Sequence, residues 1–130
     1  MMVSRISDHV DALIDGVIVW ENLFAKGDAQ ELGFRVSVNM ACVLTDDTSE
    51  RVALQSEIKK LYGIRSKIVH GGYHPSPSEA AALRRRVQVL TLQSLQRIVK
   101  NHPQLLGADT NSFMSFVISG SYQAGANTLQ

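Results

Sequence analysis

The chain has 130 residues, a length that fits one domain able to bury a core without disulfides or metal ions. Hydrophobic residues make up 45% and charged residues 19%, and the net charge is only +1, so any case for nucleic-acid binding must rest on a local patch. No stretch reaches the roughly 18 apolar residues of a membrane span, and the first residues lack the long apolar segment of a signal peptide. We therefore expect a cytoplasmic protein with no membrane partner.

Two helices are expected in the first third of the chain. Apolar residues recur at intervals of three and four over residues 6–25, which predicts a helix, and Gly27 and Asp28 suit a helix stop followed by a helix start. A second helix is expected over residues 29–44. Residues 34–38 alternate as a strand would, but the length of the segment and the small residues after it favour a helix.

Two side chains in these helices need an explanation. Cys42 lies in an apolar run and is the single cysteine, so it has no disulfide partner and no evident metal site. We expect it to be a buried small hydrophobic residue, which fits a reducing compartment. We expect Trp20 in the core or at a dimer interface.

The third helix begins after Asp47, because Asp47 and Glu50 have the spacing of a capping box, and it ends at Gly71 and Gly72. Its expected inward stripe consists of Leu54, Ile58, Leu61, Ile68 and Val69.

Ser76-Pro77-Ser78-Glu79 predicts the next helix start, with Ser76 as the N-cap. This fourth helix is expected over residues 77–101, with His102-Pro103 ending it. Its expected inward residues are Leu83, Val87, Leu90, Leu95, Ile98 and Val99.

A fifth, shorter helix is expected over residues 110–119. Together these elements predict an all-α fold, a helical bundle of four to five helices formed by residues 1–119 as a single domain. Residues 120–130 are rich in Gly, Ser, Asn and Gln, and we expect a flexible tail there.

Arg65 does not fit the apolar stripe of the third helix. It lies seven residues after Ile58 and four after Leu61, near the middle of that stripe. Because an unpaired guanidinium is costly in a core, Arg65 must meet an acid, extend to the edge or face a wet cleft. His70, five residues later, lies about 140° further round an ideal helix and shares a face with Arg65 only if the helix end distorts. The simplest interpretation is that Arg65 pairs with Glu21 or another acidic residue of the first helix and that His70 merely ends the third helix.

More than spacing is present around Arg65. Residues 61–72, LYGIRSKIVHGG, resemble the core motif of HEPN domains, and they look closest to the Apea-like branch. Residues 18–24, IVWENLF, are similar to a helix of that branch, and residues 34–44 resemble its next helix. The resemblance covers roughly residues 14–100, with the twelve central residues as its specific part.

The resemblance implies a dimeric HEPN-like bundle and a metal-independent endoribonuclease of the kind found in toxin–antitoxin and antiphage defence systems. In that family an Arg and a His from each of two protomers line one composite cleft. Carried over, Arg65 and His70 are the catalytic candidates and Ser66 is the polar residue between them. Many active members have Asn, Asp or His at this position, so Ser66 departs from the family pattern in a way that concerns catalysis more than fold.

The chemistry of these residue types suits RNA cleavage. A histidine with a near-neutral pKa can act as base or acid, and an arginine can grip phosphate oxygens. Lys67 is a basic candidate beside the phosphate, Tyr73 and Tyr62 could stack on bases (packing is the stronger role for Tyr62), and Glu21 could orient Arg65.

The implied partners are an RNA substrate, a second copy of the chain and an antitoxin or another regulatory protein, with no cofactor and no metal. Two alternatives stay open from the sequence. One is a non-catalytic module of the same fold that binds RNA or nucleotides. The other is a dimerisation module in which Arg65 is buried against an acid.

Overall fold

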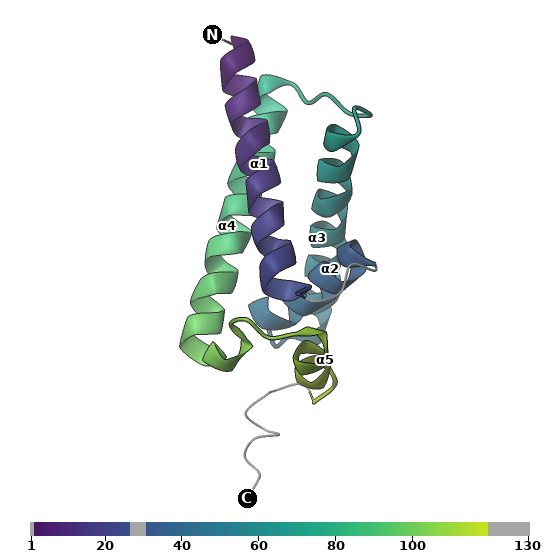
Figure 1. Ribbon diagram of the computed structural model, residues 1–130, viewed down its shortest axis with the longest axis vertical. Helices are drawn as coiled ribbons and strands as arrows, with labels where there is room; N and C mark the ends of the chain where they lie inside the picture. The colour runs from purple at the N-terminus through teal and green to yellow at the C-terminus, as the bar shows by residue number, and fades with distance from the viewer. Residues whose placement is uncertain (1, 27–30, 120–130) are drawn as a thin grey trace, which may run out of the picture.

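The computed structural model describes residues 2–26 and 31–119, and all its regular elements are helices (Figure 1). Within these residues there is no strand, so the expected all-α class is confirmed and the alternation at 34–38 lies inside a helix. No helix in the described part is long and apolar enough to cross a membrane. The elements in chain order are α1 (Met2–Phe24), α2 (Leu32–Leu44), α3 (Thr48–Val69), α4 (Pro77–Asn101), the short 3-10 helix η1 (Pro103–Leu105) and α5 (Thr110–Ser119).

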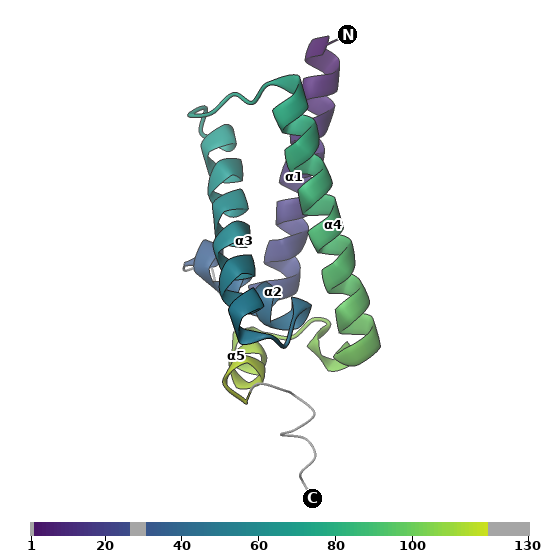
Figure 2. The same cartoon turned by 180° about the vertical axis from the view of Figure 1, so that it is seen from behind.

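The four long helices form two packed pairs. Helices α1 and α4 lie side by side and run in the same direction, as both views of the ribbon show (Figures 1 and 2). Trp20 Nε1 of α1 donates a hydrogen bond of 2.7 Å to Thr91 Oγ1 of α4. Helix α2 packs antiparallel to α3, and Gln55 Nε2 of α3 donates to Ser37 Oγ of α2 at 3.0 Å.

Helix α2 is much shorter than its partner. It has 13 residues and α3 has 22, and the ring of Tyr62 lies against Gly33 near the start of α2. The part of α3 that follows Tyr62, residues 63–69, therefore extends beyond α2. This part carries most of the segment that resembles the HEPN motif.

The core is apolar and draws on all five α-helices. Trp20 has no exposed surface, so of its two expected places it occupies the core, and Cys42 is buried as expected. Phe113 of α5 packs edge-to-face on Phe24, with ring centroids 5.7 Å apart, which docks α5 against the end of α1. Fully buried large side chains include Leu13, Trp20, Phe24, Met40, Ile58, Leu90, Ile98, Phe113 and Phe116.

The expected helix ends of α3 and α4 are confirmed in detail. Asp47 Oδ1 accepts the Glu50 N–H at 2.9 Å, and Ser76 and Glu79 form a complete capping box at the start of α4. Helix α4 ends at Asn101 and α5 spans 110–119, both as expected. The expected tail, 120–130, falls outside the described residues.

Several sequence expectations were wrong. Helix α1 begins at Met2 rather than near residue 6, and α2 begins at Leu32 rather than 29, after Glu31 with a left-handed φ of 51°. The expected start at Asp28 lies outside the described residues. Val69 and Val99 were expected inward but are 52% and 61% exposed, because Val69 lies beyond α2 and Val99 lies on the outer face of α4.

Candidate functional site around Arg65

The end of α3 is shaped by two glycines. The Gly71 N–H donates to Ile68 O at 3.1 Å and the Gly72 N–H to Lys67 O at 2.7 Å, with Gly71 at a φ of +79°. This is the Schellman arrangement, which needs a residue that tolerates the left-handed region. It ends the helix abruptly and leaves His70 exposed as the last residue before the turn.

Arg65 meets an acid from another helix. Its Nη2 donates to Glu21 Oε2 of α1 at 2.9 Å, and the Arg65 and Glu21 side chains are only 16% and 25% exposed. The Tyr62 hydroxyl donates to the same carboxylate oxygen at 2.5 Å. The guanidinium carbon of Arg65 lies 4.8 Å from the centroid of the Tyr62 ring, within reach of a cation–π interaction. The expected pairing of Arg65 with Glu21 is therefore present, with Tyr62 as a third member.

The ionisation of Tyr62 reflects this setting. Burial, together with the hydrogen bond and negative charge of Glu21, raises the pKa of Tyr62 to about 12, against a smaller opposing effect of Arg65. Tyr62 thus stays protonated over the physiological range and remains a donor to Glu21. Two donors on one carboxylate fix the orientation of the Arg65 side chain.

Arg65 keeps unused donor capacity. Its Nε is buried and has no hydrogen-bond partner among the described residues. A buried donor without a partner costs about 1–3 kcal/mol, so the site holds Arg65 at some expense in stability.

The other expected site residues lie apart from this triad. Lys67 is exposed, Ser66 is partly exposed, and Tyr73 is partly exposed in the loop before α4. Burial, followed by the nearby Glu79, raises the pKa of Tyr73 above its usual value. Within the described part of the chain, no hydrogen bond or ion pair joins Arg65 to His70. One copy therefore brings Glu21, Tyr62 and Arg65 together and leaves His70 separate from them.

Exposed apolar side chains flank the triad. Ile18 precedes Glu21 by three residues on α1, and Val69 follows Arg65 by four on α3, so each shares a helix face with its charged neighbour. They are 43% and 52% exposed. The triad is thus bordered by apolar surface on the part of the molecule that α2 does not cover.

Helix α4 carries three consecutive arginines, Arg84 to Arg86, and two of them have polar partners that the sequence analysis did not predict. Arg86 forms a bidentate pair with Glu57 of α3 at 2.5 and 2.8 Å, and Arg84 lies 3.2 Å from His9 Nδ1 of α1. These partners lie on other helices, and no local spacing signals them. In the part of the chain that the structure describes, no group of three or more His, Cys, Asp or Glu side chains is placed to hold a metal ion.

Comparisons of the chain with models of protein families, with curated proteins and with solved structures found no match. The functional argument therefore rests on the residues of this chain and on the resemblance of its motif.

Proposed function

We propose that the chain is a HEPN-type, metal-independent endoribonuclease that acts as a homodimer. The observation that carries the proposal is the Arg65 triad: a largely buried arginine is held by Glu21 and Tyr62 on the helix that ends in an exposed His70. Arginines oriented by a second residue suit the recognition of phosphate oxygens. The resemblance of residues 61–72 to the HEPN motif supports the same assignment.

The proposed reaction needs two histidines. His70 of one copy accepts the proton of an RNA 2′-hydroxyl, whose oxygen attacks the adjacent phosphorus. Protonated His70 of the second copy gives its proton to the departing 5′-oxygen as the phosphorus–oxygen bond breaks. Arg65 stabilises the charge that develops on the phosphoryl oxygens. The products are a 2′,3′-cyclic phosphate and a 5′-hydroxyl.

A second copy of the chain would also account for two features of the single copy. His70 does not contact Arg65 within one copy, so a cleft shared across a two-fold axis supplies the missing proximity. Ile18 and Val69 offer exposed apolar surface beside the triad, which a second copy would cover. A ribonuclease of this kind fits a toxin or antiphage effector held in check by an antitoxin.

The test is cleavage of mixed RNA by the purified protein in the presence of EDTA. We expect the wild type to leave 2′,3′-cyclic phosphate ends and His70→Ala to lose at least about a hundredfold in rate. His74→Ala is the matched control, because His74 is also exposed and lies four residues further on. Cleavage by His70→Ala and Arg65→Ala at the wild-type rate would refute the proposal.

A second candidate is a non-catalytic module that binds RNA or nucleotides. It is favoured by Ser66, which stands where active family members carry Asn, Asp or His, and by Glu21, which already neutralises the charge of Arg65. This candidate predicts salt-sensitive RNA binding without products. A dimer that binds no RNA even at low salt would instead indicate a dimerisation module.

A further inference from the structure

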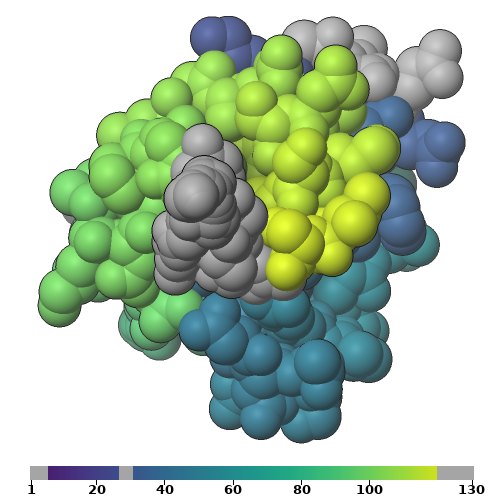
Figure 3. All heavy atoms as spheres, turned by 90° about the horizontal axis from the view of Figure 1, so that it is seen from below, coloured from purple at the N-terminus to yellow at the C-terminus, as the bar shows by residue number. Residues whose placement is uncertain are grey.

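Helix α5 is docked at the end of the bundle onto which Figure 3 looks. It follows α4 after η1 and a short loop, and two buried aromatic rings anchor it. Phe113 packs on Phe24 of α1, and the ring of Phe116 meets the ring of His102 edge-to-face, with centroids 4.9 Å apart. Because His102 is also the C-cap residue of α4, it connects the end of α4 to the docked face of α5.

The imidazole of His102 is poorly satisfied in this position. The residue is only 5% exposed, and its Nδ1 is buried with no hydrogen-bond partner in the part of the chain that the structure describes. A buried polar atom without a partner destabilises a fold, and an apolar side chain could fill the contact with Phe116 without this penalty. Packing alone therefore does not explain a histidine at this position.

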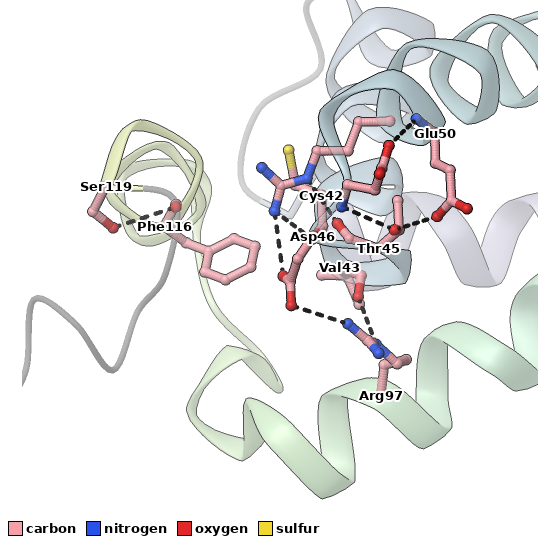
Figure 4. Close-up of polar contacts among 10 residues, drawn as sticks. Cys42, Val43, Thr45, Asp46, Glu50, Arg97, Phe116 and Ser119 are labelled. Atoms are coloured by element: carbon pink, nitrogen blue, oxygen red, sulfur yellow. Dashed lines mark hydrogen bonds and ion pairs between the residues drawn. The ribbon is translucent and has the colours of Figure 1, made fainter.

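Two charged side chains act on His102 in opposite directions. Arg97 of α4 disfavours a positive charge on the ring and Asp46 of the α2–α3 turn favours it, but burial is the largest effect and the pKa of His102 is lowered. Figure 4 shows Arg97 meeting Asp46, with the ring of Phe116 pointing toward them from α5. Arg97 Nη2 lies 3.9 Å from Asp46 Oδ2, and Arg51 Nη2 lies 3.6 Å from Asp46 Oδ1. Asp46 is thus shared by two arginines, and neither η1 nor α5 carries a charged side chain.

We propose that His102 is a proton-operated latch, which holds α5 on the bundle when it is neutral and releases α5 when it is protonated. Both nitrogens of a protonated imidazole are donors, and Nδ1 has no acceptor among the described residues while α5 is docked. Undocking of α5 would open the ring to water, which hydrates the charge. It would also uncover the contact between Phe113 and Phe24, so the acid form offers an apolar surface that the neutral form hides.

The direction of the pH dependence follows from the lowered pKa of His102. Docking of α5 should be strongest above pH 6.5 and should weaken as the pH falls through the lowered value. The latch does not depend on the ribonuclease assignment, because it shares no residue with the Arg65 triad and does not involve His70.

Hydrogen exchange of the full chain at pH 7.5 and pH 5.0, followed by mass spectrometry and corrected for intrinsic rates, tests the latch. We expect α5 to exchange by local opening, with protection at least about tenfold lower than that of α1 around Trp20. The opening equilibrium of α5 should rise at least about fivefold between the two pH values. His102→Gln has a side chain that does not titrate, so it should make the opening of α5 independent of pH.

His74→Gln is the matched control, because His74 is exposed in the loop before α4 and its loss should leave the pH dependence of α5 unchanged. A titration of the wild type by nuclear magnetic resonance keeps the test decisive if His102→Gln does not fold. The ring signals of His102 and the amide signals of α5 should then share one midpoint below pH 6.5. The latch is overturned if these midpoints differ or if α5 opens only when the whole bundle unfolds. It is equally overturned if His102→Gln keeps the pH dependence or His74→Gln removes it.

Discussion

Replacing Glu21 with glutamine should reveal how tightly the structure depends on the Arg65 triad. The substitution keeps the size of the side chain and removes the charge that Arg65 and Tyr62 both contact, at 2.9 and 2.5 Å. Arg65 would then be a guanidinium only 16% exposed with no carboxylate beside it. The loss in the free energy of unfolding should therefore exceed the loss on breaking an ordinary surface ion pair.

The size of this loss can be estimated from how far the Arg65 and Glu21 side chains are exposed. Hydrogen bonds to charged groups contribute about 1.5–3 kcal/mol, and partial exposure places Glu21→Gln near the middle, at about 2 kcal/mol. For a domain of this size that corresponds to a fall in melting temperature of about 8 °C. Glu57→Gln is the matched control, because its pair with Arg86 is bidentate but 36–41% exposed. Exposed pairs contribute about 1 kcal/mol or less.

Chemical denaturation of both variants measures the difference in the free energy of unfolding. We expect Glu21→Gln to lower the free energy of unfolding at least twice as much as Glu57→Gln, although the Glu57 pair has two hydrogen bonds, of 2.5 and 2.8 Å. Adding Arg65→Met to Glu21→Gln should recover most of the loss, because it removes the unpaired charge. If the two single variants lose the same free energy of unfolding, or if the double variant recovers none of it, then burial does not determine how much these ion pairs contribute to stability.

Three further changes test packing and ionisation. Gly16→Ala should lower the free energy of unfolding by about 1–3 kcal/mol, because the added Cβ would lie 2.5 Å from Val87 Cγ1. Gly63→Ala should raise it by about 0.5–1 kcal/mol, because the added Cβ meets nothing within 4 Å. Denaturation curves of the two variants that shift in the same direction would contradict this. Because the pKa of Tyr62 is raised from 10.0 to about 12, the stability that it contributes is complete below pH 10 and should be lost between pH 10 and 12, and Tyr62→Phe should remove this loss. Burial lowers the pKa of His102 below 6.5, so the stability that neutral His102 contributes is complete above pH 6.5 and should fall as the pH is lowered. If His102→Gln leaves the loss of stability at acidic pH unchanged, this prediction is wrong.

The features that sequence predicted well are local ones. Asp47 caps α3 and Ser76 caps α4 because a side chain and a backbone N–H three residues away decide the contact. The stop at Gly71 follows from its conformational freedom. The pairing of Arg65 with Glu21 is long-range, but the position of an arginine within an apolar stripe already made an acidic partner one of three expected outcomes.

The features that sequence missed depend on neighbouring helices. Val69 continues the apolar stripe of α3, and its exposure follows only from where α2 begins, at Leu32. Val99 has the right spacing for the core, but it is 61% exposed, so no other helix of the described residues covers it. The bidentate pair of Arg86 with Glu57 joins residues of two helices, and no spacing rule links them.

One place where this chain departs from the rules of a stable bundle coincides with its candidate site around Arg65. Along most of its length, local signals, packing and polar pairing agree with one another, as they do in a sequence that specifies one structure. Beside α3 these features disagree, because the buried Arg65 Nε has no hydrogen-bond partner among residues 2–26 and 31–119 and Val69 is exposed. Since apolar residues in place of a largely buried charged pair are often neutral or stabilising, the pair of Arg65 with Glu21 is more readily explained by what it binds than by what it supports.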